Sequence, residues 1–264
     1  MNLRPKPLRA RLSAKGPQWP AGVARHICES LDSTNTHALR LAPETTGPAW
    51  FLAYEQTAGK GRRARPWVSP RGNFHATLLL HPTEPASQVA LRSFAAALAL
   101  RDALVRLTDL PQAFTLKWPN DVLLNGGKLA GILLESTSTG QGIAHLAIGT
   151  GVNLIACPDA AMVEEGALKP VSLLGETGLR IEPEVFLTHL AAAYDHWEQV
   201  FTTHGFAPLR AAWLSHAAKL GETIRARTGT TTRTGIFETI DATGALILTT
   251  AEGHQAIPAA EVFF

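Results

Sequence analysis

Short apolar runs, separated by polar residues, glycine or proline, recur along most of the chain. Runs of this length between turn-forming residues are typical of buried strands. Two of them, 122–124 and 129–135, are joined by Asn125-Gly126-Gly127, which accept positive φ, so they predict a β-hairpin. The other expected strands of the first domain cover 23–28, 49–54, 73–81, 114–117 and 145–153.

Longer stretches repeat their apolar positions with the period of a helix. Pro183 suits the first turn of one of them. Hydroxyl and amide side chains at 32–36 are typical caps for a short helix over 37–41, whereas 158–180 is expected to be irregular. The pattern therefore predicts an α+β domain, a sheet covered by helices. The three longer expected helices cover 88–107, 183–204 and 208–216.

The pattern of apolar and polar residues changes near Lys219. Short segments in which apolar and polar residues alternate begin there, separated by glycine turns. Such segments predict a small β-barrel over 219–264. The main domain then covers 21–218 and is preceded by a flexible arm, 1–20, that combines four prolines with scattered cations. The expected strands of the barrel are 223–226, 236–240, 245–248 and 256–262.

Composition narrows the classes of function. A chain of 264 residues with 45% hydrophobic content can bury a real core. The net charge of +2 does not indicate a nucleic-acid partner, and about 22 residues before the first expected strand leave no room for a helix-turn-helix. Two cysteines, no secretory signal and no apolar run near 18 residues predict a cytoplasmic protein without a membrane segment.

The most unusual stretch is 54–72, which carries five cations and no acid after Glu55. Gly59 and Gly61 bracket the first cation, so backbone amides can approach an anion that the cations surround. This composition predicts a phosphate-bearing ligand. The five cations are Lys60, Arg62, Arg63, Arg65 and Arg71.

Several interpretations of this stretch compete. A dinucleotide fingerprint would have to open a helix, but Pro66 and Pro70 follow, and a Walker A loop would need Ser or Thr where Gly61 stands. A nucleic-acid patch is favoured by the charge but has few aromatic residues nearby. A solvated basic loop does not explain glycines threaded among cations. A mobile loop that folds over a phosphate-bearing ligand accounts for both the cluster of cations and the glycines among them.

Five segments, taken together, resemble motifs of biotin protein ligases. Residues 59–65, Gly-Lys-Gly-Arg-Arg-Ala-Arg, resemble the family's biotin-binding loop, Gly-Arg-Gly-Arg-Arg-Gly-Arg. Residues 32–35 are similar to its Ser-Thr-Asn segment, and 117–121 to its Lys-Trp-Pro-Asn-Asp motif. Residues 128–133 are similar to its Lys-Leu-Ala-Gly-Ile-Leu segment, and 149–153 to its Gly-x-Gly-x-Asn strand end.

The resemblance implies a class II synthetase-like mixed sheet flanked by helices, with a C-terminal SH3-like β-barrel. It implies that ATP, with Mg²⁺, and biotin form biotinyl-5′-AMP. A lysine of a biotin carboxyl carrier protein, from acetyl-CoA carboxylase or a related carboxylase, then accepts the biotinyl group. Without a DNA-reading domain the enzyme is expected to be monofunctional, and the resemblance leaves homodimer formation open.

The resemblance also implies roles for individual residues. Lys128 and Arg62 match catalytic positions, because fixed cations must hold the biotin carboxylate and the α-phosphate together. Asp121 matches a magnesium contact, since a carboxylate suits that ion. The positions implied for biotin are Ser33, Thr34, Asn35, Gln56, Lys60, Gly61, Arg62 and Lys128. Those implied for ATP or the adenylate are Arg62, Arg63, Arg65, Trp67, Asn120 and Asn153.

Two departures from the family pattern fall in the loop. Lys60 replaces an arginine, so a bidentate contact is lost and weaker retention of the adenylate is expected. Ala64 replaces a glycine, which costs energy if the position needs positive φ. Lipoate or octanoate attachment on the same fold is the nearest alternative, although 33–35 and Gln56 suit a ureido ring better than an apolar tail. A nucleic-acid-binding module is the alternative from another class.

Overall fold

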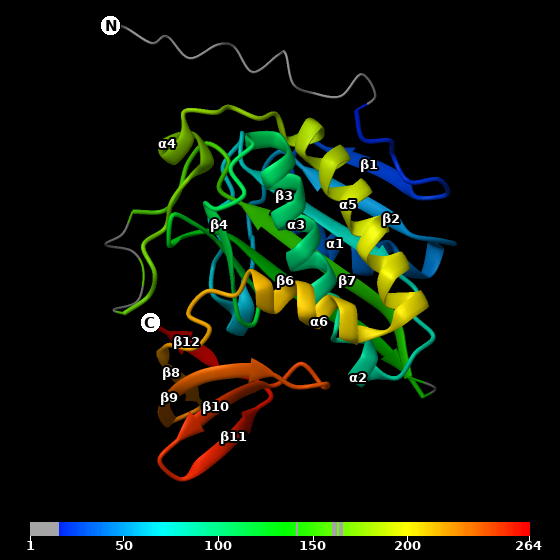
Figure 1. Ribbon diagram of the computed structural model, residues 1–264. Coiled ribbons are helices and arrows are strands. Elements are labelled where there is room, and N and C mark those ends of the chain that lie inside the picture. The colour runs from blue at the N-terminus through cyan, green and yellow to red at the C-terminus, as the bar shows by residue number, and fades with distance from the viewer. Residues whose placement is uncertain (1–15, 141, 160–162, 164–165) are drawn as a thin grey trace, which may run out of the picture.

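A mixed seven-stranded sheet forms the larger part of the protein. The computed structural model describes residues 16–140, 142–159, 163 and 166–264. The strands are β1 (Ala24–Cys28), β2 (Ala49–Ala53), β3 (Phe74–Leu80), β4 (Phe114–Lys117), β5 (Asp121–Leu124), β6 (Gly127–Thr139) and β7 (Gly142–Val152). Their order is β1-β2-β3-β7-β6-β5-β4 (Figure 1). Only β1 and β2 run parallel, and the remaining neighbours are antiparallel.

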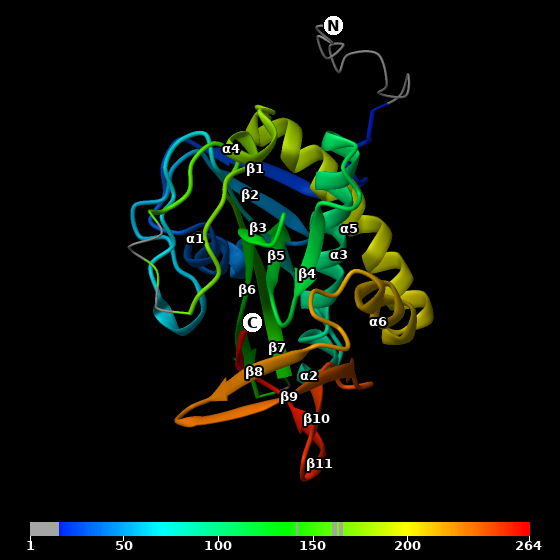
Figure 2. The same ribbon diagram turned by 60° about the vertical axis from the view of Figure 1, so that its left-hand side comes forward.

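Helices lie on both faces of this sheet. The three longer ones cover one face, and α1 lies on the other beside the basic loop (Figures 1 and 2). The expected mixed sheet flanked by helices is therefore confirmed. The helices are α1 (Thr34–Leu41), α2 (Ala86–Val89), α3 (Arg92–Thr108), α4 (Leu173–Thr177), α5 (Pro183–His204) and α6 (Phe206–Ser215), with 3₁₀ turns η2 (Ala42–Glu44) and η3 (Arg62–Ala64).

Alternation along the central strands explains this layering. In β2, Trp50 and Leu52 enter the large core, while Phe51 packs in a smaller cluster with Ala38 of α1. Successive strand residues point to opposite faces, so one strand serves both layers. In β3 the same alternation turns Thr77 toward α1, where it hydrogen-bonds to the first turn of that helix.

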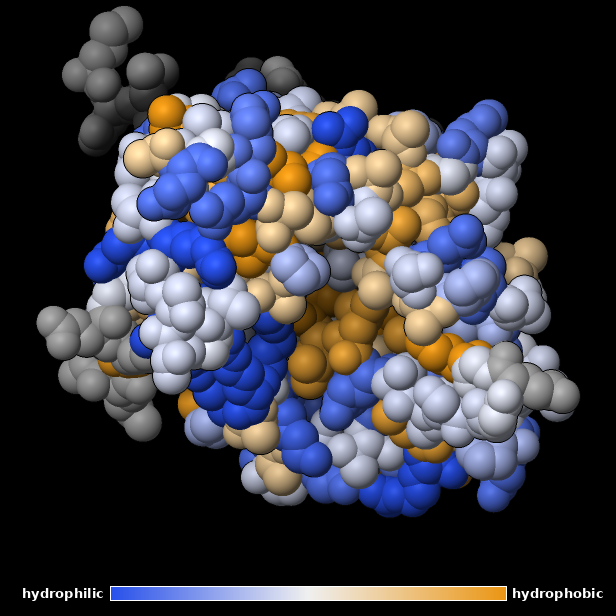
Figure 3. Space-filling model, turned by 90° about the horizontal axis from the view of Figure 1, so that it is seen from below, coloured by the Kyte–Doolittle hydropathy of each residue, from blue (hydrophilic) through white to orange (hydrophobic). Residues whose placement is uncertain are grey.

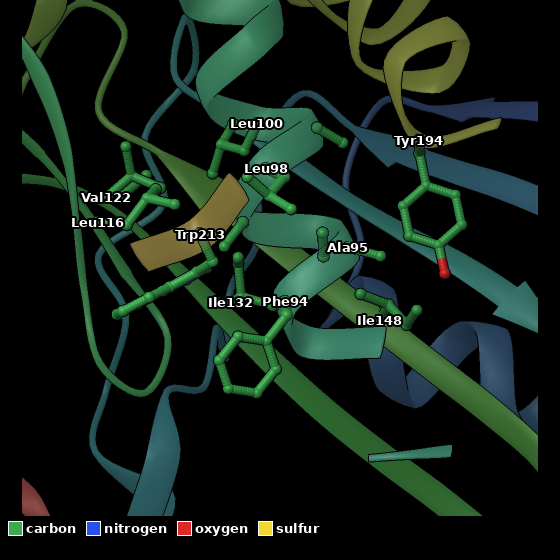
Figure 4. Packing of buried hydrophobic residues seen from close by; sticks show 14 of the residues in the cluster. Phe94, Ala95, Leu98, Leu100, Leu116, Val122, Ile132, Ile148, Tyr194 and Trp213 are labelled. Atoms are coloured by element: carbon green, nitrogen blue, oxygen red, sulfur yellow. The ribbon is translucent and has the colours of Figure 1, made fainter. Parts of the chain in front are cut away.

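The large core centres on α3. Phe94 packs edge-on against Trp213 of α6, with ring centroids 5.6 Å apart (Figure 4). Leu116 and Val122, from β4 and β5, belong to the same buried cluster. The helical cover and strands β4 and β5 therefore share one core, which holds the site-bearing face of the sheet rigid.

The C-terminal part is an open antiparallel sheet. Its strands are β8 (Thr223–Thr228), β9 (Thr231–Ile240), β10 (Leu246–Thr250), β11 (Gly253–Ile257) and β12 (Glu261–Phe263). Their order is β11-β10-β9-β8-β12, and no pairing in the described chain joins β11 to β12. The small β-barrel expected over 219–264 is, in the described residues, a five-stranded antiparallel sheet. The single strand expected over 256–262 is two strands, because a turn at 258–260 carries the chain to the opposite edge.

This sheet packs into the same core as the first one. Gly244, in the turn before β10, has positive φ, and an added Cβ would lie 3.0 Å from both Leu91 and Phe94. The Trp118 indole donates a hydrogen bond to Gly244 O at 3.1 Å, and Arg210 of α6 donates to Ile240 O. The two sheets are therefore tightly joined, and β12 can take part in a site on the larger one.

The structure confirms the expected hairpin and refines several other elements. Asn125 and Gly126 have φ of 50° and 81°, the conformation required of a two-residue hairpin loop. The helix expected over 88–107 is interrupted, because i→i−3 hydrogen bonds at Leu91 and Ser93 separate α2 from α3. The region 158–180 contains α4, which is too short to show a period.

Most of the arm expected over 1–20 lies outside the described residues. Within the described part, the Trp19 indole donates to Val23 O at 2.8 Å. None of the described helices is long and apolar enough to cross a bilayer. The face seen from below has an apolar hollow with a hydrophilic border (Figure 3).

Candidate active site

A cavity of about 470 Å³ opens between the start of α1, the basic loop 54–72, strands β6 and β7, and β12. This volume suits a small-molecule ligand. Every site residue predicted from the sequence lines it except Arg63, which is exposed and pairs with Glu261 at 2.9 Å. Segments far apart in the sequence thus meet around one cavity.

Neutral polar side chains from the start of α1 form one part of its wall. Ser33 caps the helix by accepting a hydrogen bond from Thr36 N, and both Ser33 and Thr34 are buried. Gln56 Oε1 accepts a hydrogen bond from Thr34 N at 2.8 Å, and Gln56 Nε2 donates to Ser69 Oγ at 2.9 Å. Ser33 therefore both caps α1 and lines the cavity.

Two glycines of β7 give this wall its shape. A Cβ at Gly149 would lie 2.3 Å from Asn35 Oδ1, and one at Gly151 would lie 2.4 Å from Trp67 Nε1. Glycine within a strand permits a close approach, and the groups that approach here are the side chains of Asn35 and Trp67. Because the two glycines are about 7 Å apart along the strand, β7 sets Asn35 and Trp67 side by side along the cavity.

A cationic group lies beyond Trp67. Lys128 Nζ is 5.8 Å from the Trp67 ring centroid and 2.8 Å from Asp121 Oδ1. Lys117 Nζ lies 3.7 Å from Asp121 Oδ2. Burial alone would raise the pKa of Asp121, but the Lys128 and Lys117 ammonium groups hold it below its usual value. Burial lowers the pKa of Lys117.

The backbone around Lys128 is fixed on both sides. Its N–H donates to Lys169 O at 2.8 Å, and its carbonyl accepts from Val171 N at 3.0 Å. A Cβ at Gly127 would lie 2.4 Å from Val171 Cγ1, so this segment can approach only because residue 127 is glycine. Lys128 therefore projects from a rigid strand start, although a third of its side chain stays exposed.

The residues at Asp121 do not fit a resident magnesium ion. Both carboxylate oxygens face lysine ammonium groups, and Arg62 lies close enough to lower the carboxyl pKa further. The described residues contain no group of three or more His, Cys, Asp or Glu side chains that could hold a metal. A divalent cation would meet like charge here, so the predicted magnesium contact at Asp121 is disfavoured.

The basic loop folds back on itself as a tight turn. Gly61 N donates to Arg65 O at 2.7 Å, and Trp67 N donates to Gly59 O at 2.9 Å. Between them, Arg63 and Ala64 adopt φ of 56° and 57°. The position where the chain has alanine instead of glycine thus needs positive φ. Lys60 is exposed at the cavity rim, and its expected effect on adenylate retention stays a prediction.

Arg62 is the loop cation that turns inward. Its Nη1 donates to Asn120 Oδ1 at 3.3 Å and to Ala260 O at 3.4 Å. Asn120 is held in turn by a hydrogen bond from its Nδ2 to Ile132 O at 2.7 Å. Asn153 is buried and donates to Val171 O at 3.1 Å, so its amide holds the segment behind Lys128.

Sequence reasoning missed Glu261 of β12. Its carboxylate accepts hydrogen bonds from Arg63, Arg65 and Arg227, the last at 2.6 Å. Burial opposes ionisation, yet the hydrogen bonds from Arg65 and Arg227 lower the pKa of Glu261 to about 2. No spacing in the sequence pointed to it, because the loop and β12 meet only in the fold. Val262 and Phe263 beside it also line the cavity.

The cavity therefore combines two kinds of wall. Neutral donors and acceptors suit an uncharged polar ring, while Lys128, Lys117 and Arg62 suit two anions held close together. Trp67 lies between the two groups and offers a flat aromatic surface. Such an arrangement can bring a carboxylate and a phosphate together against their repulsion.

Comparisons with known proteins agree with this geometry. Residues 27–153 match the model of the Biotin/lipoate A/B protein ligase family, and residues 219–264 match that of the Biotin protein ligase C terminal domain. The chain is similar to a Biotin--[acetyl-CoA-carboxylase] ligase from Paracoccus denitrificans, with 58% identity over 88% of this chain and 97% of the other.

More distant relatives cover similar parts of the chain. A Bifunctional ligase/repressor BirA from Bacillus subtilis is 33% identical over 88% of this chain and 71% of its own. The solved structure of the biotin protein ligase from Aquifex aeolicus in complex with biotin and ATP has 25% identity and a TM-score of 0.77. That match covers 90% of this chain and 98% of the other. By sequence, fold and arrangement of the cavity, the chain belongs to the biotin protein ligase family.

Proposed function

We propose that this protein uses ATP to convert biotin to biotinyl-5′-AMP and then transfers the biotinyl group to a lysine of a carrier protein. The observation that carries the proposal is one cavity that has both a neutral polar wall, beside Thr34 and Gln56, and a cationic wall, at Lys128. The relatives named for biotin ligation support it.

Each wall has a task in this reaction. The neutral wall binds the ureido ring, which carries donors and an acceptor but no charge. Lys128 and Arg62 hold the biotin carboxylate against the α-phosphate and offset the charge that builds up there. Asp121 keeps Lys128 aimed into the cavity, since their charged groups lie 2.8 Å apart. Magnesium enters as the ion that accompanies the phosphates of ATP.

The basic loop acts as a lid in this proposal. Trp67 and Arg65 then belong to the nucleotide part of the site, and Lys60 and Gly61 to its biotin part. Arg63, which points to Glu261, contributes by fixing the turn. The division into a catalytic unit, 21–218, and a C-terminal unit, 219–264, is part of the proposal, with the second unit supplying one wall.

The expected carrier is the biotin carboxyl carrier protein of acetyl-CoA carboxylase or a related carboxylase. We further propose a cytoplasmic enzyme that does not use DNA as a partner. A DNA titration against salt checks the last point, because a real binder loses affinity steeply as salt rises. Homodimer formation stays a prediction that light scattering of the purified protein would test.

The test of the proposed function is a biotinylation assay. The protein is incubated with biotin, MgATP and a biotin carboxyl carrier domain, and the carrier is weighed by mass spectrometry. We expect the mass of one biotinyl group to be added. A parallel reaction with lipoate or octanoate should leave the carrier of those acids unmodified, and modification there instead of with biotin would reject the proposal.

Lys128→Ala should greatly slow adenylate formation, because it removes the ammonium group that the start of β6 holds at the cavity. A loss of at least 100-fold in the rate of pyrophosphate release is expected, about the cost of removing a fixed transition-state charge. Circular dichroism should stay unchanged. Arg40→Ala, which removes an exposed cation paired with Asp32 outside the cavity wall, is the matched control.

A further inference from the structure

Asn35 lines the cavity, but its amide is committed to protein partners. The side chain is 3% exposed. Its Nδ2 donates to Glu135 Oε2 at 2.8 Å and to Leu133 O at 3.2 Å, and its Oδ1 accepts a hydrogen bond from Thr77 Oγ1 at 2.6 Å. Both amide hydrogens and one lone pair are therefore used, so Asn35 holds its neighbours in place.

Glu135 determines which way this amide points. An ionised carboxylate and a backbone carbonyl can only accept hydrogen bonds, so both require Nδ2 on their side of Asn35. The reverse orientation would turn Oδ1 toward two acceptors and leave Thr77 facing an NH₂ group. No described residue forms an ion pair with Glu135, so charge pairing does not account for its place on β6.

The orientation passes along a short chain of hydroxyl groups. Thr77 has one hydroxyl hydrogen, which goes to Asn35 because Oδ1 can only accept. Thr34 Oγ1 lies 2.8 Å from Thr77 Oγ1 and must therefore be the donor in that contact. Thr34 Oγ1 also lies 3.1 Å from Gln56 Oε1, but this longer contact cannot use the same hydrogen. Gln56 Oε1 already accepts a hydrogen bond from Thr34 N.

The consequence appears at the cavity wall. With its hydrogen turned to Thr77, Thr34 Oγ1 presents lone pairs to a ligand and acts as an acceptor. A cyclic urea offers N–H donors at its two nitrogens, which match such an acceptor. A hydroxyl that is free to rotate could act as either donor or acceptor. It would then distinguish less well between a ring with N–H donors and a ring without them.

We propose that Glu135 is a positioning residue that, through Asn35 and Thr77, fixes Thr34 as an acceptor for a ring N–H of the substrate. The inference rests on the proposed function and adds to it the group that orients the ring-binding wall. Glu135 does not contact the substrate and does not line the cavity, so its effect must pass through Asn35.

The test is a steady-state comparison of Glu135→Ala with the wild-type protein. The KM for biotin is expected to rise about tenfold, equal to about 1.4 kcal/mol. The KM for ATP is expected to stay the same, because Lys128 and Arg62 are untouched. A double-mutant cycle with Asn35→Ala should be non-additive, with the double variant no worse than Asn35→Ala alone. Additive effects, or equal rises in both KM values, would overturn the proposal.

Two further variants separate positioning from a general structural role. Thr77→Val keeps the shape but breaks the hydroxyl chain, so it should raise the biotin KM to a similar extent and serves if Glu135→Ala does not fold. An unchanged biotin KM in Thr77→Val contradicts the inference. Glu135→Gln retains an acceptor oxygen and should raise the KM less than Glu135→Ala does.

Ser136→Ala changes the exposed next residue of β6 and is the matched control, with wild-type KM values expected. Failure of the proposed function looks different from failure of this inference. If the wild-type protein forms no biotinyl-adenylate, the proposed function is wrong. If it does, and the variants keep the wild-type KM for biotin, only the role of Glu135 is wrong.

Discussion

Single residues in the basic loop are held in conformations that their type disfavours. Arg63 and Ala64 both have positive φ, with values of 56° and 57°. A side chain with a Cβ costs about 1–2 kcal/mol in that region, and glycine avoids the cost. The turn persists because its flanks are fixed, by Gly61 N on Arg65 O and by Arg62 on Asn120.

Ala64→Gly should stabilise the protein by about 0.5 kcal/mol in free energy of unfolding. Relief of the left-handed strain outweighs the greater freedom that glycine has in the unfolded chain. Urea denaturation measures the change. Ala58→Gly is the control in the same loop, since Ala58 has no positive φ, and it should lower stability by about 0.5 kcal/mol. The same sign for both variants would contradict the strain argument.

At the scale of elements, the most consequential contact joins the basic loop to β12. Glu261 forms ion pairs with Arg63 and Arg65 of the loop and with Arg227 of β8. Its side chain is only 20% exposed, so the charges are less screened than on an open surface. The loop is thereby held against the small sheet.

Glu261→Gln should loosen that contact without unfolding either sheet. The amide cannot offset three guanidinium charges, so the Gly61 N–H, bonded to Arg65 O, should exchange with solvent at least tenfold faster. Hydrogen-exchange mass spectrometry of the loop measures this. Glu252→Gln, an exposed carboxylate on the same sheet, should leave loop exchange unchanged. Unchanged exchange in Glu261→Gln would mean that the hairpin bonds alone hold the loop.

At the scale of the whole molecule, buried ionisable groups make the fold sensitive to acid. His75 of β3 is 1% exposed, and burial lowers its pKa to about 4 from 6.5. Because the pKa of His75 is lower in the folded protein than in the unfolded chain, its contribution to the free energy of unfolding is fully present above pH 6.5. That contribution is lost as pH falls toward 4. Glu261, with a pKa lowered from 4.5 to about 2, acts in a lower window.

His75→Gln should flatten the loss of stability between pH 6.5 and 4. The wild-type protein should lose about 2–3 kcal/mol more than the variant across this range, since each pKa unit corresponds to about 1.4 kcal/mol. Urea titrations at several pH values give the two curves. His204→Gln, a substitution at an exposed histidine in the last turn of α5, is the matched control. Parallel curves for His75→Gln and the wild type would show that His75 does not carry this dependence.

Local patterns were sufficient for most of the elements. The hairpin at Asn125-Gly126 and the helix beginning at Pro183 follow from turn chemistry and periodicity within a few residues. The interruption between α2 and α3 and the short helix α4 were not predictable in this way. They depend on hydrogen bonds and packing that a local window does not contain.

The sequence by itself determined the order of strands and helices, the family motifs and the residue types that line the cavity. Only the tertiary structure decided how those residues act on one another. Asp121 faces two lysines, Asn35 faces Glu135, and the loop arginines meet Glu261 from a strand near the other end of the chain. These pairings depend on sheet register and on the packing of two sheets, and neither is a local property of the chain.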